Sequence, residues 1–550
     1  MRRLALSIIL WAALAGQALP LWQSAAYGAE SDIRLREGQE IYRRGQTSAT
    51  PAITVRLREG DASYPARNFR CANCHGSAGQ GGREAGLRTP AIDAKNLARP
   101  IIPQGERHAR PAYDRDTLKR VIASGIDAAG APLGAGMPRY RMSDAQLDTL
   151  IDYIQVLGTF DDNDPGIDRD SIKLGAALPL TGPMAAMGKD VAALLKARFD
   201  LVNGAGGIYG RRLILVIADC GNSDEEIRTA TRQLVTDQEV FALVASFQPV
   251  DHDALDAWLA DTQVPLVGPV GQAAHEITPM DAPIWQLLPT LNDQARVLVD
   301  YVMSLPTPTG VDTPRRIAII RAETPGAADA ATGATAQLTQ YGASVFALQI
   351  AGSDASTATE VARLTEKEKP EHILFFGGSR QLQAFAAALY AGDGNAAPIG
   401  ALALLGAARD MPEIPADKLV LAYPGEPTDE AQWSSLMNKG AGDDSSANSS
   451  AFQAVAFAAV AVLQESLMRA GRRLNRDSLT RELDGLHGFE SGVLPPLEFR
   501  RDNRIGSRGA SIVQFDRSQA RYIAKWSWRS RRTEFHAVGL GAAAKKAPDN

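Results

Sequence analysis

The residues with the clearest chemistry are the two thiols and the imidazole of Cys71-Ala72-Asn73-Cys74-His75. In this C-x-x-C-H spacing two cysteines can form thioether bonds to the vinyl groups of one haem, while the adjacent histidine reaches the iron. A redox dithiol would need a βαβ pattern around the motif, and a zinc site would need a second cysteine pair. Instead, a glycine-rich run over 76–82 lets the backbone approach a planar cofactor. The motif predicts one covalently attached haem c.

A second iron ligand is expected further along the chain. Met137 lies in a loop of Gly and Pro residues over 134–140, where a thioether can reach a metal, and not on the apolar face of a helix. Met142 and His108 are the alternatives, although His108 stands in a charged stretch typical of a surface. We expect His75 and Met137 to be the two axial ligands.

The elements that must position these residues are helical. Ser143 is a typical helix start, and apolar residues then recur at helical spacing up to Leu157. Together with Gly38-Gln39-Glu40-Ile41-Tyr42, the C-x-x-C-H motif and the Met-Pro loop, this last helix resembles class I cytochromes c over residues 30–160. The resemblance implies a small all-α domain, His75/Met137 ligation, one-electron transfer and a periplasmic redox partner. Residues 46–68 depart from that family as an insertion.

The N-terminus predicts export. Arg2 and Arg3 precede an apolar run over 4–16, and small residues follow up to Ala29. A membrane anchor is the alternative, but a span needs about 20 apolar residues, and Gln17 and Pro20 interrupt this one. We therefore expect a cleaved signal peptide over 1–29, a periplasmic protein and no stable membrane anchor.

A second domain begins after an acidic segment with Pro and Gly, which predicts a linker over 161–170. Strand-like runs then alternate with helical ones: strands over 172–178, 213–218, 241–244, 265–267, 316–320 and 372–376, and a helix over 188–203. Such alternation predicts parallel sheets covered by helices. The length of the segment 171–517 is enough for two lobes with a ligand cleft between them.

Several short runs in this order resemble type I periplasmic solute-binding proteins, specifically the branched-chain amino-acid receptors of ABC importers. The runs are Leu180-Thr181-Gly182-Pro183, the glycine-rich turn 203–210, Ala218-Asp219, Gln286-Leu287-Leu288-Pro289-Thr290 and Ala451-Phe452-Gln453-Ala454-Val455. The resemblance covers residues 171–517. It implies the α/β two-lobed type I fold, a small organic solute as ligand and an ABC permease as a partner.

Candidate ligand-binding residues follow the expected strand ends. They are Met187, Ser246, Phe247, Gln248, Asp251, Gln272, Ala273, Glu323, Ser379 and Arg380. Each has an ordinary alternative, because Met187 and Phe247 are also typical of a core and Arg380 of an exposed helix start.

The ligand itself is expected to differ from that of the amino-acid receptors. Matched to their binding loops, Met187 and Pro325 stand where tyrosines are expected, and the acidic residue that meets the ligand ammonium falls near Ala403 or Leu404. Asp251 lies in the loop that would grip the ligand carboxylate, and it would repel that group. We expect a ligand other than an ordinary α-amino acid.

Composition narrows the remaining choices. The 550 residues carry 58 Lys plus Arg against 63 Asp plus Glu, a net charge of −5, which argues against a nucleic-acid partner. No hydrolase or nucleotide-binding motif is present, and Cys220 is expected to be a lone buried thiol. Residues 518–550 are expected to form a tail.

Three functions remain to be compared. The first is an electron carrier fused to a solute receptor and accessory to a periplasmic dehydrogenase. The second is a receptor that delivers its solute to an ABC permease, with the haem secondary. The third, a haem peroxidase, is disfavoured because Met137 would occupy the coordination position that peroxide needs. The chain is thus expected to be a carrier and binding protein and not an enzyme.

Overall fold

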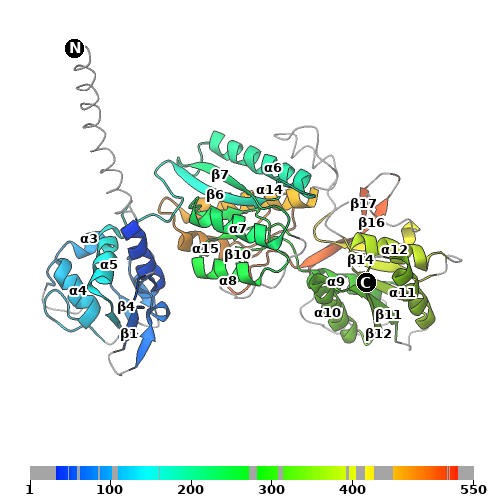
Figure 1. Cartoon of the computed structure of the whole chain (residues 1–550), viewed down its shortest axis with the longest axis horizontal. Coiled ribbons are helices and arrows are strands. Elements are labelled where there is room, and N and C mark those ends of the chain that lie inside the picture. Colours follow the sequence, from blue (N-terminus) through cyan, green and yellow to red (C-terminus); the bar gives the residue numbers. More distant parts are fainter. Residues whose placement is uncertain are drawn as a thin grey trace, which may run out of the picture. The chain divides into compact units, whose positions relative to one another are not determined.

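The computed structural model describes residues 33–530, apart from 48, 58–61, 85–86, 102–108, 135, 160–161, 272–281, 307–313, 353, 392–395, 404–414, 427–449, 517 and 519–520. The expected signal peptide lies outside these residues. The chain forms two compact units, which divide between Asn163 and Asp164 (Figure 1). Each unit has its own buried apolar core.

The first unit is built mainly from helices. A helix over 33–44 is followed by α2 (Cys71–His75), α3 (Ala94–Leu97), α4 (Arg115–Ser124) and α5 (Asp144–Val156). The start of α5 was expected from the sequence, and Ser143 and Gln146 form a capping box there. Gly38 lets the first helix approach α5 closely, because a Cβ at this position would lie 2.5 Å from the carbonyl oxygen of Thr149.

The inserted segment 46–68 supplies two strands that the resemblance to an all-α domain did not predict. β1 (Thr54–Arg56) pairs antiparallel with β2 (Ser63–Pro65) and with β5 (Arg139–Arg141). Because β5 begins two residues after Met137, the insertion braces the loop that carries this methionine. The short hairpin of β3 (Gly82–Glu84) and β4 (Leu87–Thr89) follows the haem motif.

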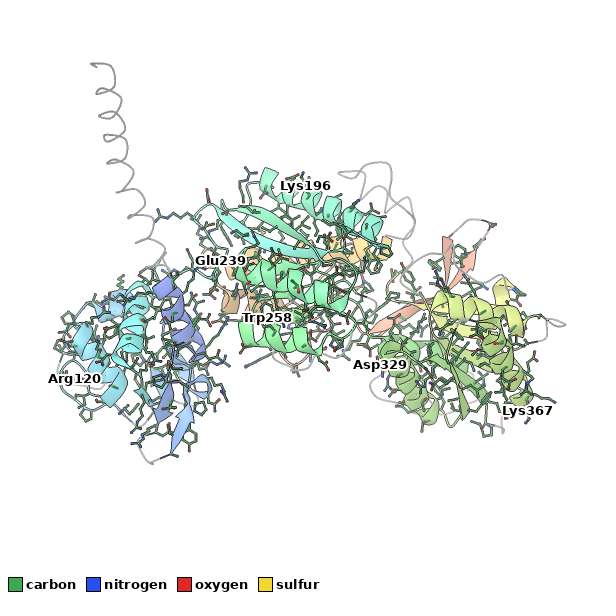
Figure 2. The ribbon with its side chains drawn as sticks, viewed as in Figure 1. Arg120, Lys196, Glu239, Trp258, Asp329 and Lys367 are labelled. Carbon is green, nitrogen blue, oxygen red and sulfur yellow. The ribbon has the colours of Figure 1, made fainter. Side chains whose placement is uncertain are left out.

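The second unit opens with a five-stranded parallel sheet of order β10-β9-β8-β6-β7. Its strands are β6 (Ser171–Leu178), β7 (Arg212–Asp219), β8 (Ala242–Val244), β9 (Leu266–Val267) and β10 (Ile284–Trp285). The associated helices are α6 (Ala185–Gly204), α7 (Asp224–Thr236), α8 (Asp253–Thr262), α14 (Ser450–Ala470) and α15 (Arg476–Asp484). Trp258, labelled in Figure 2, lies on α8.

A seven-stranded sheet of order β12-β11-β13-β14-β15-β16-β17 forms the other lobe. Its strands are β11 (Arg316–Ala322), β12 (Ser344–Ile350), β13 (His372–Phe376), β14 (Ile399–Leu402), β15 (Leu419–Tyr423), β16 (Gly509–Asp516) and β17 (Arg521–Ser530). Its helices are α9 (Leu291–Ser304), α10 (Pro325–Gln340), α11 (Ala355–Glu368) and α12 (Ser379–Leu389). The sheet is parallel except for its last two strands, which are antiparallel.

The prediction of a tail over 518–550 is wrong for residues 521–530, which form β17. Residues 521–530 pair with β16, and Trp526 packs edge-on against Tyr301 of α9 at 5.2 Å between ring centroids. The charged run of this segment suggested a solvated end, but its aromatic residues alternate with polar ones as in a half-buried strand. The binding lobe therefore extends through residue 530.

The division between the two units falls inside the expected linker over 161–170, and the described residues of this segment are hydrogen-bonded to folded structure. Asp162 accepts hydrogen bonds from the Arg43 side chain at 3.0 Å and from the backbone N–H of Gly158 at 2.9 Å. Asp164 accepts a hydrogen bond from the backbone N–H of Arg476 at 2.5 Å. Polar residues that favour linkers thus serve here as fixed acceptors at the ends of the two units.

Candidate functional site

The haem motif is a single helical turn. α2 spans Cys71–His75, and it ends at Gly76, whose φ of 80° suits glycine. The hydroxyl of Tyr42 donates to the carbonyl oxygen of Gly76 at 2.8 Å, and Thr89 donates to that of Cys74 at 2.5 Å. Burial raises the pKa of the Cys71 thiol to about 11, while Cys74 is exposed. The motif is therefore held at its carboxyl end by side chains from two other segments.

His75 is oriented as an iron ligand requires. Its side chain is buried, and Nδ1 lies 2.9 Å from the carbonyl oxygen of Pro90. Because a carbonyl only accepts, Nδ1 carries the proton and Nε2 keeps its lone pair for a metal. Burial also lowers the pKa of His75, which favours the neutral form that binds iron.

The Met137 loop is fixed mainly by Arg139. The guanidinium of this residue donates to the carbonyl oxygens of Met137 and Leu133, the latter at 3.2 Å. It also lies against Gly125, where a Cβ would be 1.9 Å from the Arg139 Cζ. Tyr140 is buried, and its hydroxyl donates to the carbonyl oxygen of Phe69, just before the haem motif. These contacts connect the methionine loop to the segment that carries the two cysteines.

The residues present fit a haem c. Two thiols, a buried imidazole with a free Nε2 and a half-buried thioether form the donor set that such a group needs. Of the alternative ligands, Met142 packs against the apolar core, and His108 lies outside the described residues. Over the described parts of the chain, no three His, Cys, Asp or Glu residues gather as a separate metal site.

A pocket lies in the first lobe of the second unit, at the carboxyl ends of three strands. We call it the strand-end pocket. Its walls come from the residues after β8, β9 and β10 and from the start of α14, namely Gln248, Pro269, Val270, Gly271, Gln286, Leu287, Leu288, Phe452 and Val455. Among the residues that the structure describes, the lining contains amide and apolar side chains and no charged one. This is where parallel α/β sheets bind ligands.

Two of the expected ligand-binding residues lie at this pocket. Gln248 lines it directly, and the ring of Phe247 packs against that of Phe452 at 6.1 Å between centroids. Ser246 is buried one residue earlier, and its hydroxyl oxygen accepts a hydrogen bond from the backbone N–H of Ala177 at 3.1 Å. Ser246 therefore ties β8 to β6, behind the pocket wall.

The other expected residues are not brought together at this pocket. Met187 packs in the core of the first lobe, and Asp251 is exposed in the loop before α8. On the other lobe, Glu323 is exposed and accepts a hydrogen bond from Gln349, Ser379 is half-buried at the start of α12, and Arg380 is exposed. Gln272 and Ala273 lie outside the described residues.

Each of the two units matches a known protein family. The family model for periplasmic binding proteins matches residues 171–520, which is more than half of the chain. The chain belongs to the periplasmic binding protein family. The cytochrome c family model matches residues 57–158, within the unit that carries the haem motif. Both types are binding or electron-transfer families and not catalytic ones.

Individual relatives are more distant. A Leu/Ile/Val-binding protein homolog 3 of Brucella melitensis biotype 1 is 28% identical over 132 residues, which is 24% of this chain and 36% of the relative. A homolog 7 of Brucella abortus is 27% identical over the same length, 33% of that protein. The matched part thus spans about a third of these curated relatives.

Solved structures show the same fold. A fatty acid ABC transporter substrate-binding protein from Thermomonospora curvata matches with a TM-score of 0.52 and 18% identity, covering 67% of this chain and 94% of that one. A putative branched-chain amino acid ABC transporter protein from Silicibacter pomeroyi has a TM-score of 0.53 and 15% identity, covering 66% and 99%. The likeness in fold therefore extends over nearly the whole length of both solved structures.

Sequence reasoning missed most of the pocket wall. Gln286 follows β10, which has only two residues and gives no strand pattern of its own. Phe452 and Val455 come from a helix that is more than 150 residues away from the strands it covers. The strand-end rule could have pointed to Pro269 and Gly271, which follow a predicted strand.

A polar network is connected to the strand-end pocket through Gln248. Asp256 of α8 is fully buried, and its carboxylate lies 3.2 Å from His252 Nδ1 and 3.4 Å from Gln248 Nε2. The hydrogen bond to Asp256 raises the pKa of His252. A pocket side chain is thus connected to a buried carboxylate and an imidazole.

Within the described residues, no helix is long and apolar enough to cross a membrane.

Proposed function

We propose that this protein carries one electron through a single covalent haem c in the first unit and binds a small organic solute in the second. The observation that carries the first part is the His75 imidazole, buried and donating from Nδ1 to the Pro90 carbonyl oxygen. A haem bound here would supply reversible one-electron chemistry. The chain's own part is to hold His75 neutral and in one orientation, and to offer Met137 from a braced loop.

The first test is a change of Met137 to Ala in the haem-loaded protein. Loss of a thioether ligand opens a coordination position and removes a group that favours ferrous iron. We expect a high-spin ferric spectrum and a lower midpoint potential, measured by redox titration with optical detection. An unchanged spectrum and potential would refute Met137 as ligand, and the same change at Met142 serves as control.

The solute-binding part rests on the uncharged lining of the strand-end pocket. A charged α-amino acid would leave its carboxylate and ammonium without compensating charges there, at a cost of several kcal/mol. We therefore propose a ligand other than an ordinary α-amino acid. Such a receptor, joined to a haem unit, would serve a periplasmic dehydrogenase by capturing its substrate or product, with a redox protein as electron partner.

The second candidate is delivery of the solute to an ABC permease, with the haem secondary. The two-lobed fold favours it, because the second unit has the architecture of transport receptors. Both candidates place the protein in the periplasm, after cleavage of residues 1–29.

Thermal unfolding of the haem-loaded mature protein distinguishes the two candidate functions by the class of ligand that the protein binds. A panel of amino acids, carboxylates, alcohols and aromatic compounds is added, because a ligand that binds the folded state raises the melting temperature. A shift with a non-amino-acid supports the proposal. A shift only with leucine-like ligands would make amino-acid transport the primary function.

A further inference from the structure

The strand-end pocket contains a hydrogen-bonding group whose orientation is fixed from behind. We propose that Gln248 presents its amide oxygen to the pocket, so that the receptor selects a neutral solute that donates a hydrogen bond, such as an alcohol with an apolar body. This inference rests on the proposed solute-binding function and specifies its ligand class.

The orientation of Gln248 follows from the chemistry of Asp256. An amide side chain can offer either its nitrogen or its oxygen, and the choice is set by its partners. The Asp256 carboxylate is fully buried and faces His252 Nδ1 at 3.2 Å, an arrangement that suits an ionised acid beside an imidazolium. An ionised carboxylate only accepts hydrogen bonds. Gln248 must therefore turn its NH₂ group toward Asp256, as the 3.4 Å distance from Nε2 to Oδ1 indicates.

The main chain of Gln248 is fixed as well. Its backbone N–H donates to the carbonyl oxygen of Val270 at 2.9 Å, and the preceding residue Phe247 bridges to Val270 between the two strand ends. In the part of the chain that the structure describes, no donor is bonded to the amide oxygen of Gln248. The side chain therefore brings a preset acceptor to the wall of the pocket.

An acceptor at this place discriminates among ligand groups. A hydroxyl donates to it, whereas an ether or a carboxylate cannot. An ammonium would find no carboxylate among the described lining residues to balance its charge. Among the other described lining side chains, Gln286 is a second amide, and Pro269, Leu288 and Phe452 are apolar. The chemistry of this lining favours an uncharged ligand with an apolar body and one hydroxyl group.

The test compares matched ligands on the full haem-loaded chain by isothermal titration calorimetry. The probes are 2-phenylethanol, its methyl ether, phenylacetate and phenylalanine, with 1-hexanol as the aliphatic alcohol. A site built to accept a hydrogen bond rejects an analogue that lacks the donor, because its polar group stays unpaired. We expect at least one alcohol to bind about tenfold or more tightly than the ether and the carboxylate.

Two variants test whether the preference for the alcohol over the ether depends on Gln248 and Asp256. Gln248→Met keeps the length of the side chain and removes its polar atoms, so the alcohol and the ether should bind within about twofold of each other. Asp256→Asn retains the shape but no longer forces the amide orientation, so the preference should shrink while binding persists. Gln238→Met, at an exposed position after α7, is the matched control and should keep the wild-type preference. Far-UV circular dichroism checks that each variant is folded.

The outcomes test the role of Gln248 separately from the proposed solute-binding function. Equal affinity of alcohol and ether in the wild type, or an unchanged preference in folded Gln248→Met, would overturn the role of Gln248. Tighter binding of phenylalanine or phenylacetate would overturn the ligand class and leave the receptor function standing. Absence of binding by every probe would count against both.

Discussion

At the scale of single residues, the proposed iron ligand Met137 depends on a neighbour that touches no metal. The guanidinium of Arg139 donates hydrogen bonds to the carbonyl oxygens of Met137 and Leu133, and it packs against Gly125. A planar group with five donors can fix two carbonyls at once, which a lysine cannot do with the same geometry. Arg139 is therefore a positioning residue for the methionine loop.

Changing Arg139 to Met should loosen that loop and weaken the bond between the thioether and iron. We expect a partial loss of methionine ligation, visible as a mixture of low-spin and high-spin ferric haem. The rate of cyanide binding should rise about tenfold for each 1.4 kcal/mol by which the loop is destabilised. Stopped-flow absorbance measures this rate. Arg141→Met, on an exposed position of the same strand β5, is the control and should leave the rate unchanged.

Several of these residues could be predicted from the sequence, and others could not. Cys71, Cys74 and His75 follow from spacing, because thioether attachment and iron ligation require neighbours along the chain. The Pro90 carbonyl, Arg139 and the Gln248–Asp256 pair act through space, and no local pattern marks them. Asp251 was expected at the ligand from its position after a strand, and the structure shows it exposed and not among the lining residues of the strand-end pocket.

At the scale of elements, the helix over 33–44 and α5 meet at a point where only glycine fits. A Cβ on Gly38 would lie 2.5 Å from both the Thr149 oxygen and the Tyr153 Cβ. The ring of Tyr42, one turn later, packs against Tyr153 at 5.7 Å between centroids. This crossing carries much of the core contact between the two ends of the haem unit.

Gly38→Ala should therefore destabilise the haem unit. Overpacking costs about 1–3 kcal/mol, and the better helix propensity of alanine returns about 1 kcal/mol, so we expect a net loss of up to about 2 kcal/mol. Guanidinium unfolding followed by haem absorbance measures it. Gly134→Ala, where a Cβ would meet nothing within 4 Å, should change stability little, and a comparable loss there would argue against close packing as the cause.

The elements of the binding lobes were largely predictable, whereas β1, β2 and β17 were not. Buried parallel strands show as continuous apolar runs, and β6, β7, β11 and β13 match the expected segments closely. The strands of the insertion have three residues each, too few for a periodic pattern. β17 is visible only once its partner β16 is known, because its charged residues resemble a solvated end.

At the scale of the whole molecule, the half-buried His372 at the start of β13 couples stability to pH. Burial and the nearby Arg315 guanidinium lower its pKa to about 4, whereas the unfolded chain binds a proton near pH 6.5. The contribution of this group is therefore fully present above pH 6.5 and is lost as the pH falls toward 4. The total is about 3 kcal/mol, of which about 2 kcal/mol is lost by pH 5.

Urea unfolding at pH 7 and pH 5 tests this linkage. Trp11 and Trp22 lie in the expected signal peptide, and the other tryptophans lie in the second unit, so tryptophan fluorescence of the mature chain follows the binding lobes. The loss of stability on acidification should shrink by about 2 kcal/mol in His372→Gln relative to wild type. His487→Gln, at an exposed histidine, should retain the full wild-type pH dependence, and a parallel change in both variants would refute the assignment.

The single C-x-x-C-H motif also sets a stoichiometry. Only three cysteines occur in the chain, and Cys220 is buried in the core of the first binding lobe, so the proposed attachment through Cys71 and Cys74 would give one haem per chain. Oxidation of an alcohol to an aldehyde releases two electrons, while this haem stores one. A dehydrogenase served by the protein would therefore transfer its two electrons one at a time. The acceptors would be two molecules of this protein, or one molecule that is reoxidised between the two transfers. Under the proposed function, the exchange of electrons with the next carrier must occur twice for each substrate molecule consumed.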